Sequence, residues 1–258
     1  MPVSDLDATV SVTPGLEVIA DLHLDPADLP ACEGFAGWIE ARTSLDRLVI
    51  LGDLFDSWVG PGHMQMVGAQ RVISALRAFG ERGGSVDLIW GNRDFLLDET
   101  VAREAGASLR RDALVLVNDA GERTLLVHGD ELCTLDTSYQ RLRRFLRSRV
   151  VTGLLLRMPL FATLWLARRL RAKSKRAVGG KLPEEMAMQV DVVLELARRS
   201  GASSLVCGHA HRWRDDLLDE GVRWVVLDAF GGSLDCLQVQ PGGSWVGTSS
   251  GFRLGDGS

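Results

Sequence analysis

Short apolar runs that each end in a polar motif are the feature that most constrains the fold. The runs are rich in β-branched residues and are bounded by turns with Gly or Asp, which is typical of buried strands. We predict strands at residues 16–20, 47–51, 86–90, 114–117, 124–127, 204–207, 223–227 and 234–239. Helical periodicity lies between some of them, at 66–82 and 184–200. Strand–helix alternation predicts an α/β core, and the close spacing at 114–127 and 223–239 predicts added hairpins.

Composition fits a globular chain with a sizeable core and excludes several classes of function. The chain has 258 residues, 46% of them hydrophobic, and four cysteines without a C-x-x-C pair. A net charge of −5 argues against a nucleic-acid partner, and the scattered cysteines favour a reducing compartment. The first thirty residues hold no Lys or Arg, so we expect no export signal and a cytoplasmic location. We expect one domain over 1–258, a loose Gly- and Ser-rich tail at 241–258, and no obligate protein partner.

Most of the histidines stand directly after predicted strands, together with two aspartates and an asparagine. They fall in DLH (21–23), GD (52–53), GN (91–92), HGD (128–130) and GHAH (208–211). Because ligands bind at the carboxyl ends of strands in open α/β sheets, we expect these side chains to converge. In D-x-H and H-x-H, alternate side chains point the same way from an extended segment. The predicted metal ligands are Asp21, His23, Asp53, Asn92, His128, His209 and His211.

This set of oxygen and nitrogen donors predicts a metal centre that hydrolyses phosphoesters. Donors of this kind suit Mn²⁺, Fe²⁺ or Zn²⁺ better than a pure Mg²⁺ or Ca²⁺ cage. Seven ligands suit two ions about 3.5–4 Å apart that share a carboxylate, clamp phosphate oxygens and activate a water. Each motif alone is more typical of a turn or a structural histidine, but the ordered set favours the metal site. His63 falls outside the pattern, and we expect a loop role for it.

A basic and apolar segment interrupts the otherwise acidic chain. From Thr137 to Pro183 the sequence has thirteen Lys or Arg and no Asp or Glu. The same segment carries Leu154, Phe161 and Trp165. Basic residues beside exposed apolar ones are typical of an element that lies among lipid headgroups. A solvated, arginine-rich helical pair that packs on the body is the alternative, and both can hold at once. We predict a helical insertion at 139–186.

The ordered motifs resemble the calcineurin-like metallophosphoesterase superfamily and, within it, the UDP-2,3-diacylglucosamine diphosphatase family of lipid A biosynthesis. The closer likeness is carried by IADLHL (19–24), LGDLFDSWVG (51–60), GNRDFLL (91–97) and HGDELCTLDTSY (128–139). It implies a four-layer αββα sandwich with a helical cap at 139–186 and two divalent ions, most often Mn²⁺. It assigns one ion to Asp21, His23, Asp53 and His211, and the other to Asp53, Asn92, His128 and His209.

The resemblance also implies a reaction and a location. The pyrophosphate of UDP-2,3-diacylglucosamine would be hydrolysed to UMP and 2,3-diacylglucosamine 1-phosphate, on the cytoplasmic face of the inner membrane, with the acyl chains in the cap. The implied catalytic residues are Asp53, Asn92, Arg93 and His209, and the implied substrate contacts are Asn92, Arg93, Asp136, Tyr139, Ser174, Lys181 and His209. Arg93 stands where the wider superfamily has His. Arg is no general acid, since its pKa stays above about 12, but it can hold a phosphate oxygen.

Two positions depart from the family pattern and leave alternatives open. Ala210 stands between the last two histidines where the family has Thr, and Val178 aligns with a substrate-contacting Asn. The nearest alternative is the same chemistry on another nucleotide-sugar or a phospholipid-type substrate. A scaffold that has lost catalysis is disfavoured, because all seven ligands are present. A membrane-surface adaptor, in which the insertion matters more than the site, is the third alternative.

Overall fold

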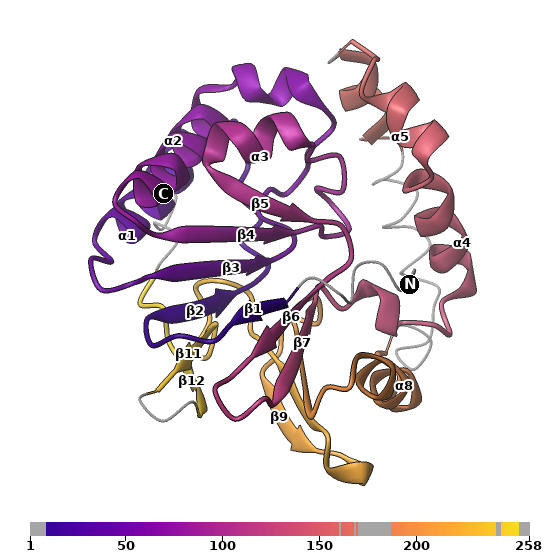
Figure 1. Cartoon of the computed structure of the whole chain (residues 1–258). Coiled ribbons are helices and arrows are strands. Elements are labelled where there is room, and N and C mark those ends of the chain that lie inside the picture. The colour runs from indigo at the N-terminus through magenta and orange to yellow at the C-terminus, as the bar shows by residue number, and fades with distance from the viewer. Residues whose placement is uncertain (1–8, 160, 168, 170–186, 241–243, 253–258) are drawn as a thin grey trace.

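The computed structural model describes residues 9–159, 161–167, 169, 187–240 and 244–252. Two six-stranded sheets lie face to face, and helices cover their outer faces (Figure 1). This arrangement confirms the predicted α/β sandwich with four layers. The strand boundaries agree with the predicted ones to within one residue, except that the run at 234–239 forms a shorter strand.

The first sheet has the strand order β12-β11-β2-β3-β4-β5. Its central strands are parallel, and β11 and β12 join antiparallel at one edge. The strands are β2 (Leu16–Ile19), β3 (Arg47–Leu51), β4 (Ser85–Ile89), β5 (Ala107–Arg110), β11 (Cys236–Val239) and β12 (Trp245–Thr248). The helices beside this sheet are α1 (Leu29–Glu40), α2 (Val67–Glu81), α3 (Glu99–Ala105) and the short η2 (Pro61–Gln65).

The second sheet has the order β1-β6-β7-β8-β10-β9, and α8 (Val190–Ser200) packs on its outer face. The strands are β1 (Thr9–Ser11), β6 (Ala113–Val117), β7 (Arg123–Val127), β8 (Ser204–Cys207), β9 (Arg214–Leu217) and β10 (Arg223–Val226). The predicted hairpin at 114–127 is confirmed, because β6 and β7 pair antiparallel. The hairpin predicted at 223–239 is wrong. β10 pairs with β8 and β9, whereas β11 pairs with β2 and β12, so the chain crosses to the other sheet between them.

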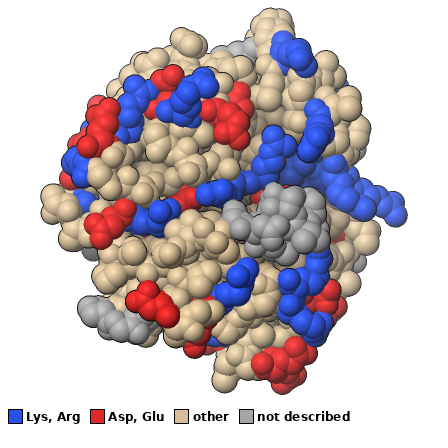
Figure 2. Space-filling view, in the orientation of Figure 1, with Lys and Arg blue, Asp and Glu red and all other residues tan. Residues whose placement is uncertain are grey.

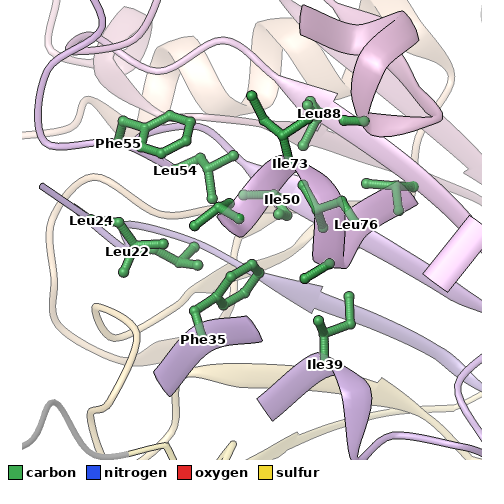
Figure 3. Packing of buried hydrophobic residues seen from close by; sticks show 14 of the residues in the cluster. Leu22, Leu24, Phe35, Ile39, Ile50, Leu54, Phe55, Ile73, Leu76 and Leu88 are labelled. Carbon is green, nitrogen blue, oxygen red and sulfur yellow. The ribbon is translucent and has the colours of Figure 1, made fainter. Parts of the chain in front are cut away.

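Alternating side chains of the central strands fill two different cores, which explains why these strands are apolar throughout. In β3, Leu48 and Ile50 face the helices and belong to the same core cluster as Phe35. Figure 3 shows Ile50 and Phe35 in this cluster. Val49 and Leu51 point the other way and pack between the two sheets. Because successive residues of a strand point to opposite faces, burial on both faces demands an unbroken apolar run. The carboxyl ends of these strands are thereby held rigidly at one edge.

The chain near its C-terminus is more ordered than its composition indicates. β12 pairs with β11, and the ring of Phe252 stacks on that of Phe230 with centroids 4.6 Å apart. The buried carboxylate of Asp235 accepts a hydrogen bond from the Ser250 backbone N–H at 2.6 Å. The loose tail predicted at 241–258 is therefore wrong for residues 244–252. Gly and Ser suggested a loop, but the apolar residues among them are packed against the body.

The predicted insertion begins with two helices, α4 (Thr137–Leu146) and α5 (Arg149–Leu155), and residues 161–167 are also helical. Figure 1 shows α4 and α5 on one side of the sandwich, beyond the carboxyl ends of the strands. Ser174, Val178 and Lys181 lie outside the described residues. In the part of the chain that the structure describes, no helix is long and apolar enough to cross a membrane.

Candidate metal centre

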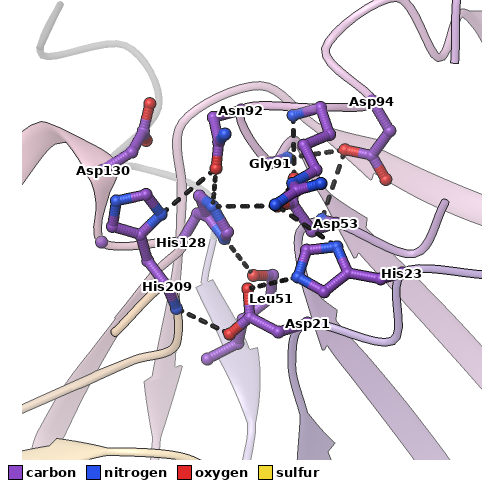
Figure 4. A network of polar contacts seen from close by, with 12 residues as sticks. Asp21, His23, Leu51, Asp53, Gly91, Asn92, Asp94, His128, Asp130 and His209 are labelled. Atoms are coloured by element: carbon purple, nitrogen blue, oxygen red, sulfur yellow. Dashed lines mark hydrogen bonds and ion pairs between the residues drawn. The ribbon is translucent and has the colours of Figure 1, made fainter. Parts of the chain in front are cut away.

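The predicted ligands lie together at the edge where the carboxyl ends of strands from both sheets meet (Figure 4). They follow β2, β3, β4, β7 and β8. The imidazole Nε2 atoms of His23 and His211 are 3.1 Å apart. Nε2 of His211 lies 3.4 Å from Oδ1 of Asp21. These three residues could hold one metal ion, since their ligand atoms all lie within 4.8 Å of one another.

A second group of ligands adjoins the first. Oδ1 of Asn92 lies 2.9 Å from Nε2 of His128 and 3.2 Å from Nδ1 of His209. Oδ2 of Asp53 lies 3.9 Å from His128 Nε2 and 3.7 Å from His23 Nδ1. Asp53 therefore stands between the two groups, which is the position a shared carboxylate requires. Asp21, Asp53 and His128 also have ligand atoms within 4.8 Å of one another.

Backbone strain is concentrated at these positions. Among the described residues other than glycine, six have a positive φ, and five of the six are predicted ligands. The five are Asp21 (55°), His23 (49°), Asp53 (50°), His209 (68°) and His211 (53°). A left-handed conformation costs about 1 kcal/mol or more for such residues and persists where the surrounding structure imposes it. The fold thus holds strained loops that aim their side chains at one centre.

The glycines of the motifs are required because the strand-end loops approach one another closely. A Cβ on Gly91 would lie 2.1 Å from Oδ1 of Asp53. A Cβ on Gly208 would lie 2.4 Å from Oδ2 of Asp21. No side chain fits at these distances, so glycine there lets the carboxylates sit against the neighbouring backbone.

The electrostatics of the site fit two cations. Oδ1 of Asp21 and Nδ1 of His23 are buried without a hydrogen-bond partner, which is costly unless another group satisfies them. Burial raises the pKa of Asp53 to about 7. Burial also opposes protonation of His128, but the nearby carboxylates of Asp53 and Asp21 raise its pKa to about 9. Two buried carboxylates among histidines thus attract positive charge, and divalent ions held by these donors would supply it.

Two further aspartates, to which the sequence analysis gave no role, support the ligands. The buried carboxylate of Asp94 accepts backbone N–H groups of Gly91 and Leu54, both at 2.8 Å. Asp56 accepts a hydrogen bond from Nη1 of Arg93 at 2.5 Å. Nε of Arg93 also lies 3.5 Å from Oδ2 of Asp53, so the guanidinium sits beside the predicted bridging carboxylate. Asp94 lies in GNRD and Asp56 lies in GDLFD, two motifs that also carry predicted site residues, so the sequence could have indicated a role for both aspartates.

The predicted substrate contacts on α4 are engaged within the protein. Asp136 is the N-cap of α4, and its Oδ1 accepts the backbone N–H of Tyr139 at 2.9 Å. The Tyr139 hydroxyl donates to Oδ2 of the buried Asp130 at 2.6 Å. Their role toward a substrate stays a prediction. The loop role expected for His63 is wrong, because His63 lies in the short helix η2; its Nδ1 accepts the backbone N–H of Val59 at 3.1 Å, so the residue has a structural contact there.

Two facing sheets bring seven predicted oxygen and nitrogen ligands together from five strand ends, an arrangement that supports a metallophosphoesterase with a dinuclear centre. No protein-family model matches the chain. A UDP-2,3-diacylglucosamine hydrolase from Pseudomonas paraeruginosa is 37% identical over 78% of this chain and 83% of its own length. One from Ralstonia nicotianae is 38% identical over 98% and 94%, respectively. The chain belongs to the UDP-2,3-diacylglucosamine hydrolase family, as the resemblance predicted. Among solved structures, a dimetal phosphatase from Danio rerio matches with 14% identity over 94% of this chain and 98% of its own, at a TM-score of 0.46.

Proposed function

We propose that this chain hydrolyses the pyrophosphate bond of UDP-2,3-diacylglucosamine to UMP and 2,3-diacylglucosamine 1-phosphate. The observation that carries the proposal is the convergence of the seven predicted metal ligands beside a basic, apolar cap. The choice of substrate follows the names of the relatives, which are UDP-2,3-diacylglucosamine hydrolases.

Residues of the chain would bind the two metal ions, and each would have a distinct role. Two divalent ions, most readily Mn²⁺, would supply Lewis-acid charge and an activated water when bound. Asp53 would be shared between the ions, since it stands between the two ligand groups. Burial lowers the pKa of His209 to about 4, so its imidazole is neutral at pH 7 and competent as a ligand.

Arg93 would hold a phosphate oxygen beside the metals. Its guanidinium is oriented by Asp56, and 39% of the side chain remains exposed. Because Arg keeps its proton, the leaving group must depart without a general acid at this position. A phosphate leaving group meets that demand, whereas a simple alkoxide does not. Arg93 thus favours a pyrophosphate substrate.

We propose that the cap receives the acyl chains and rests on the cytoplasmic face of the inner membrane. Val150, Leu154, Phe161 and Trp165 are exposed by 82%, 62%, 76% and 59%. Figure 2 shows Lys and Arg side chains gathered on the side of the molecule where α4 and α5 lie. Exposed apolar residues among cations suit an anionic lipid surface. We propose Ser174 and Lys181 as further substrate contacts, on the family resemblance alone.

Hydrolysis of UDP-2,3-diacylglucosamine in neutral detergent with Mn²⁺ tests this proposal. Bis(p-nitrophenyl) phosphate, a generic diester, and a UDP-sugar without acyl chains are assayed beside it. Fast release of UMP from the acylated substrate alone supports the proposal. Diester turnover without UMP release would keep the dinuclear hydrolase and reject this substrate. Equal use of the two UDP-sugars would remove the cap's role as an acyl receptor.

A further inference from the structure

Helix α4 is attached to the sandwich through charged and polar groups, together with the partly buried Leu146, which packs against the core beside the first sheet. None of its residues is buried. Tyr139 and Arg143 lie one turn apart on α4, and Arg147 follows one turn further on, so all three project from the same face. The Tyr139 hydroxyl and Arg143 Nε each lie 2.6 Å from Oδ2 of Asp130, and Arg147 Nη2 lies 3.5 Å from it. Asp130 is fully buried and stands two residues after His128 (Figure 4).

The same face of α4 also contacts loops of both sheets. Nη2 of Arg147 donates to the backbone carbonyl of Gly91 at 2.9 Å, directly before Asn92. The guanidinium of Arg147 lies 3.6 Å from Asp112, which joins β5 to β6. Arg143 lies 3.8 Å from the same carboxylate. One helix face is thus fastened to three strand-end loops, and two of these loops carry predicted metal ligands.

We propose that Asp130 and Arg147 are positioning residues that fix the cap in register over the metal centre and thereby determine specificity for the acylated substrate. The inference rests on the proposed function. Several guanidinium hydrogen bonds to fixed acceptors specify a geometry, whereas an apolar contact allows sliding. A substrate held by its acyl chains in the cap and by its pyrophosphate at the metals needs a constant distance between them. A misplacement of about 1 Å lowers the rate strongly, even when the chemical groups are intact.

Arg147→Ala tests the proposal, because it removes the link to the Gly91 carbonyl without touching a predicted ligand. Arg144→Ala is the matched control, since Arg144 is exposed on the same helix and its Nε donates to the Gln140 carbonyl within α4 at 3.3 Å. In neutral detergent with Mn²⁺, we expect kcat/KM for UDP-2,3-diacylglucosamine to fall about tenfold or more relative to that for bis(p-nitrophenyl) phosphate, mainly through kcat, because the bound pyrophosphate is misplaced. Metal content should stay that of the wild type, and the control should keep the wild-type ratio.

Two further measurements keep the proposal falsifiable. Hydrogen exchange of the α4 amides should be faster in Arg147→Ala than in Arg144→Ala, whatever the substrate is. Asp112→Asn changes the sheet side of the network. Like Arg147→Ala, it should lower kcat/KM for UDP-2,3-diacylglucosamine relative to that for the diester, and it should speed hydrogen exchange of the α4 amides. An equal fall in kcat/KM for both substrates, accompanied by a lower melting temperature, would overturn the inference. Unchanged hydrogen exchange of the α4 amides would overturn it as well. A wild type that hydrolyses only the diester would reject the proposed substrate, while the exchange experiment would still decide whether the network holds α4 in place.

Discussion

The metal centre and the cap of this molecule are held in place by different kinds of contact. The predicted ligands project from strand ends whose side chains are buried on both faces, and five of these residues hold a strained backbone. The cap helix α4 has no buried residue and is held largely by arginines on a few fixed acceptors. The difference indicates that the sandwich fixes the chemistry, while the exposed side chains of the cap outside the Asp130 network can change without disturbing the metal ligands. Variants of either region should therefore have separable effects.

The largest effect is expected from Asp53→Ala. Asp53 lies between both ligand groups, so its loss should empty both metal positions rather than one. We expect metal affinity and turnover to fall together by more than about a hundredfold. Elemental analysis beside diester hydrolysis measures both, and Asp119→Ala, an exposed carboxylate in a turn, is the control. An active Asp53→Ala enzyme that retains one metal ion would contradict the shared carboxylate.

A change at Gly91 should damage the metal centre almost as much without removing any ligand. An added Cβ would collide with Asp53, so Gly91→Ala should displace the carboxylate and weaken Mn²⁺ binding by about 10–100-fold. Gly37→Ala is a matched control in α1, where nothing lies within 4 Å of the new atom. It should instead stabilise the fold by about 0.5–1 kcal/mol. Calorimetric titration with Mn²⁺ and thermal melts measure these effects, and tight Mn²⁺ binding by Gly91→Ala would show that the close approach is dispensable.

The metal centre can be predicted from the sequence better than the cap, because strand order positions the ligands whereas side-chain contacts position α4. Strand ends bring motifs together by topology alone, so Asp21, His128 and His209 could be assigned to one centre from their order in the chain. The contacts of Asp130 and Arg147 depend on the angle at which α4 docks, which no local pattern specifies. The strand pairing after Val226 was mispredicted because short sequence separation favours a hairpin, while burial placed β11 in the other sheet.

Exposed apolar residues of the cap give a smaller effect that concerns location alone. Phe161→Glu with Trp165→Glu places two carboxylates in a basic surface, so binding to anionic vesicles should fall about tenfold or more. Val67→Glu, which alters an α2 side chain exposed by 63%, should leave vesicle binding unchanged. Flotation with phosphatidylglycerol vesicles measures the bound fraction. Equal binding by the cap variant and the wild type would assign membrane contact to another surface.

The smallest effect belongs to His63, which lies in neither region and is buried against Trp58. Burial lowers the pKa of His63 below its usual 6.5, so the folded state favours the neutral imidazole. The unfolded chain then takes up a proton as the pH falls below about 6.5, whereas the folded chain does not. The stability contributed by the neutral form is therefore present above that pH and lost as the pH falls toward the folded-state pKa. With metal removed from both proteins, the unfolding free energy of the wild type should drop more steeply between about pH 7 and pH 5 than that of His63→Gln. Identical slopes would show that this histidine titrates alike in both states, so His63 would contribute nothing to the pH dependence of stability.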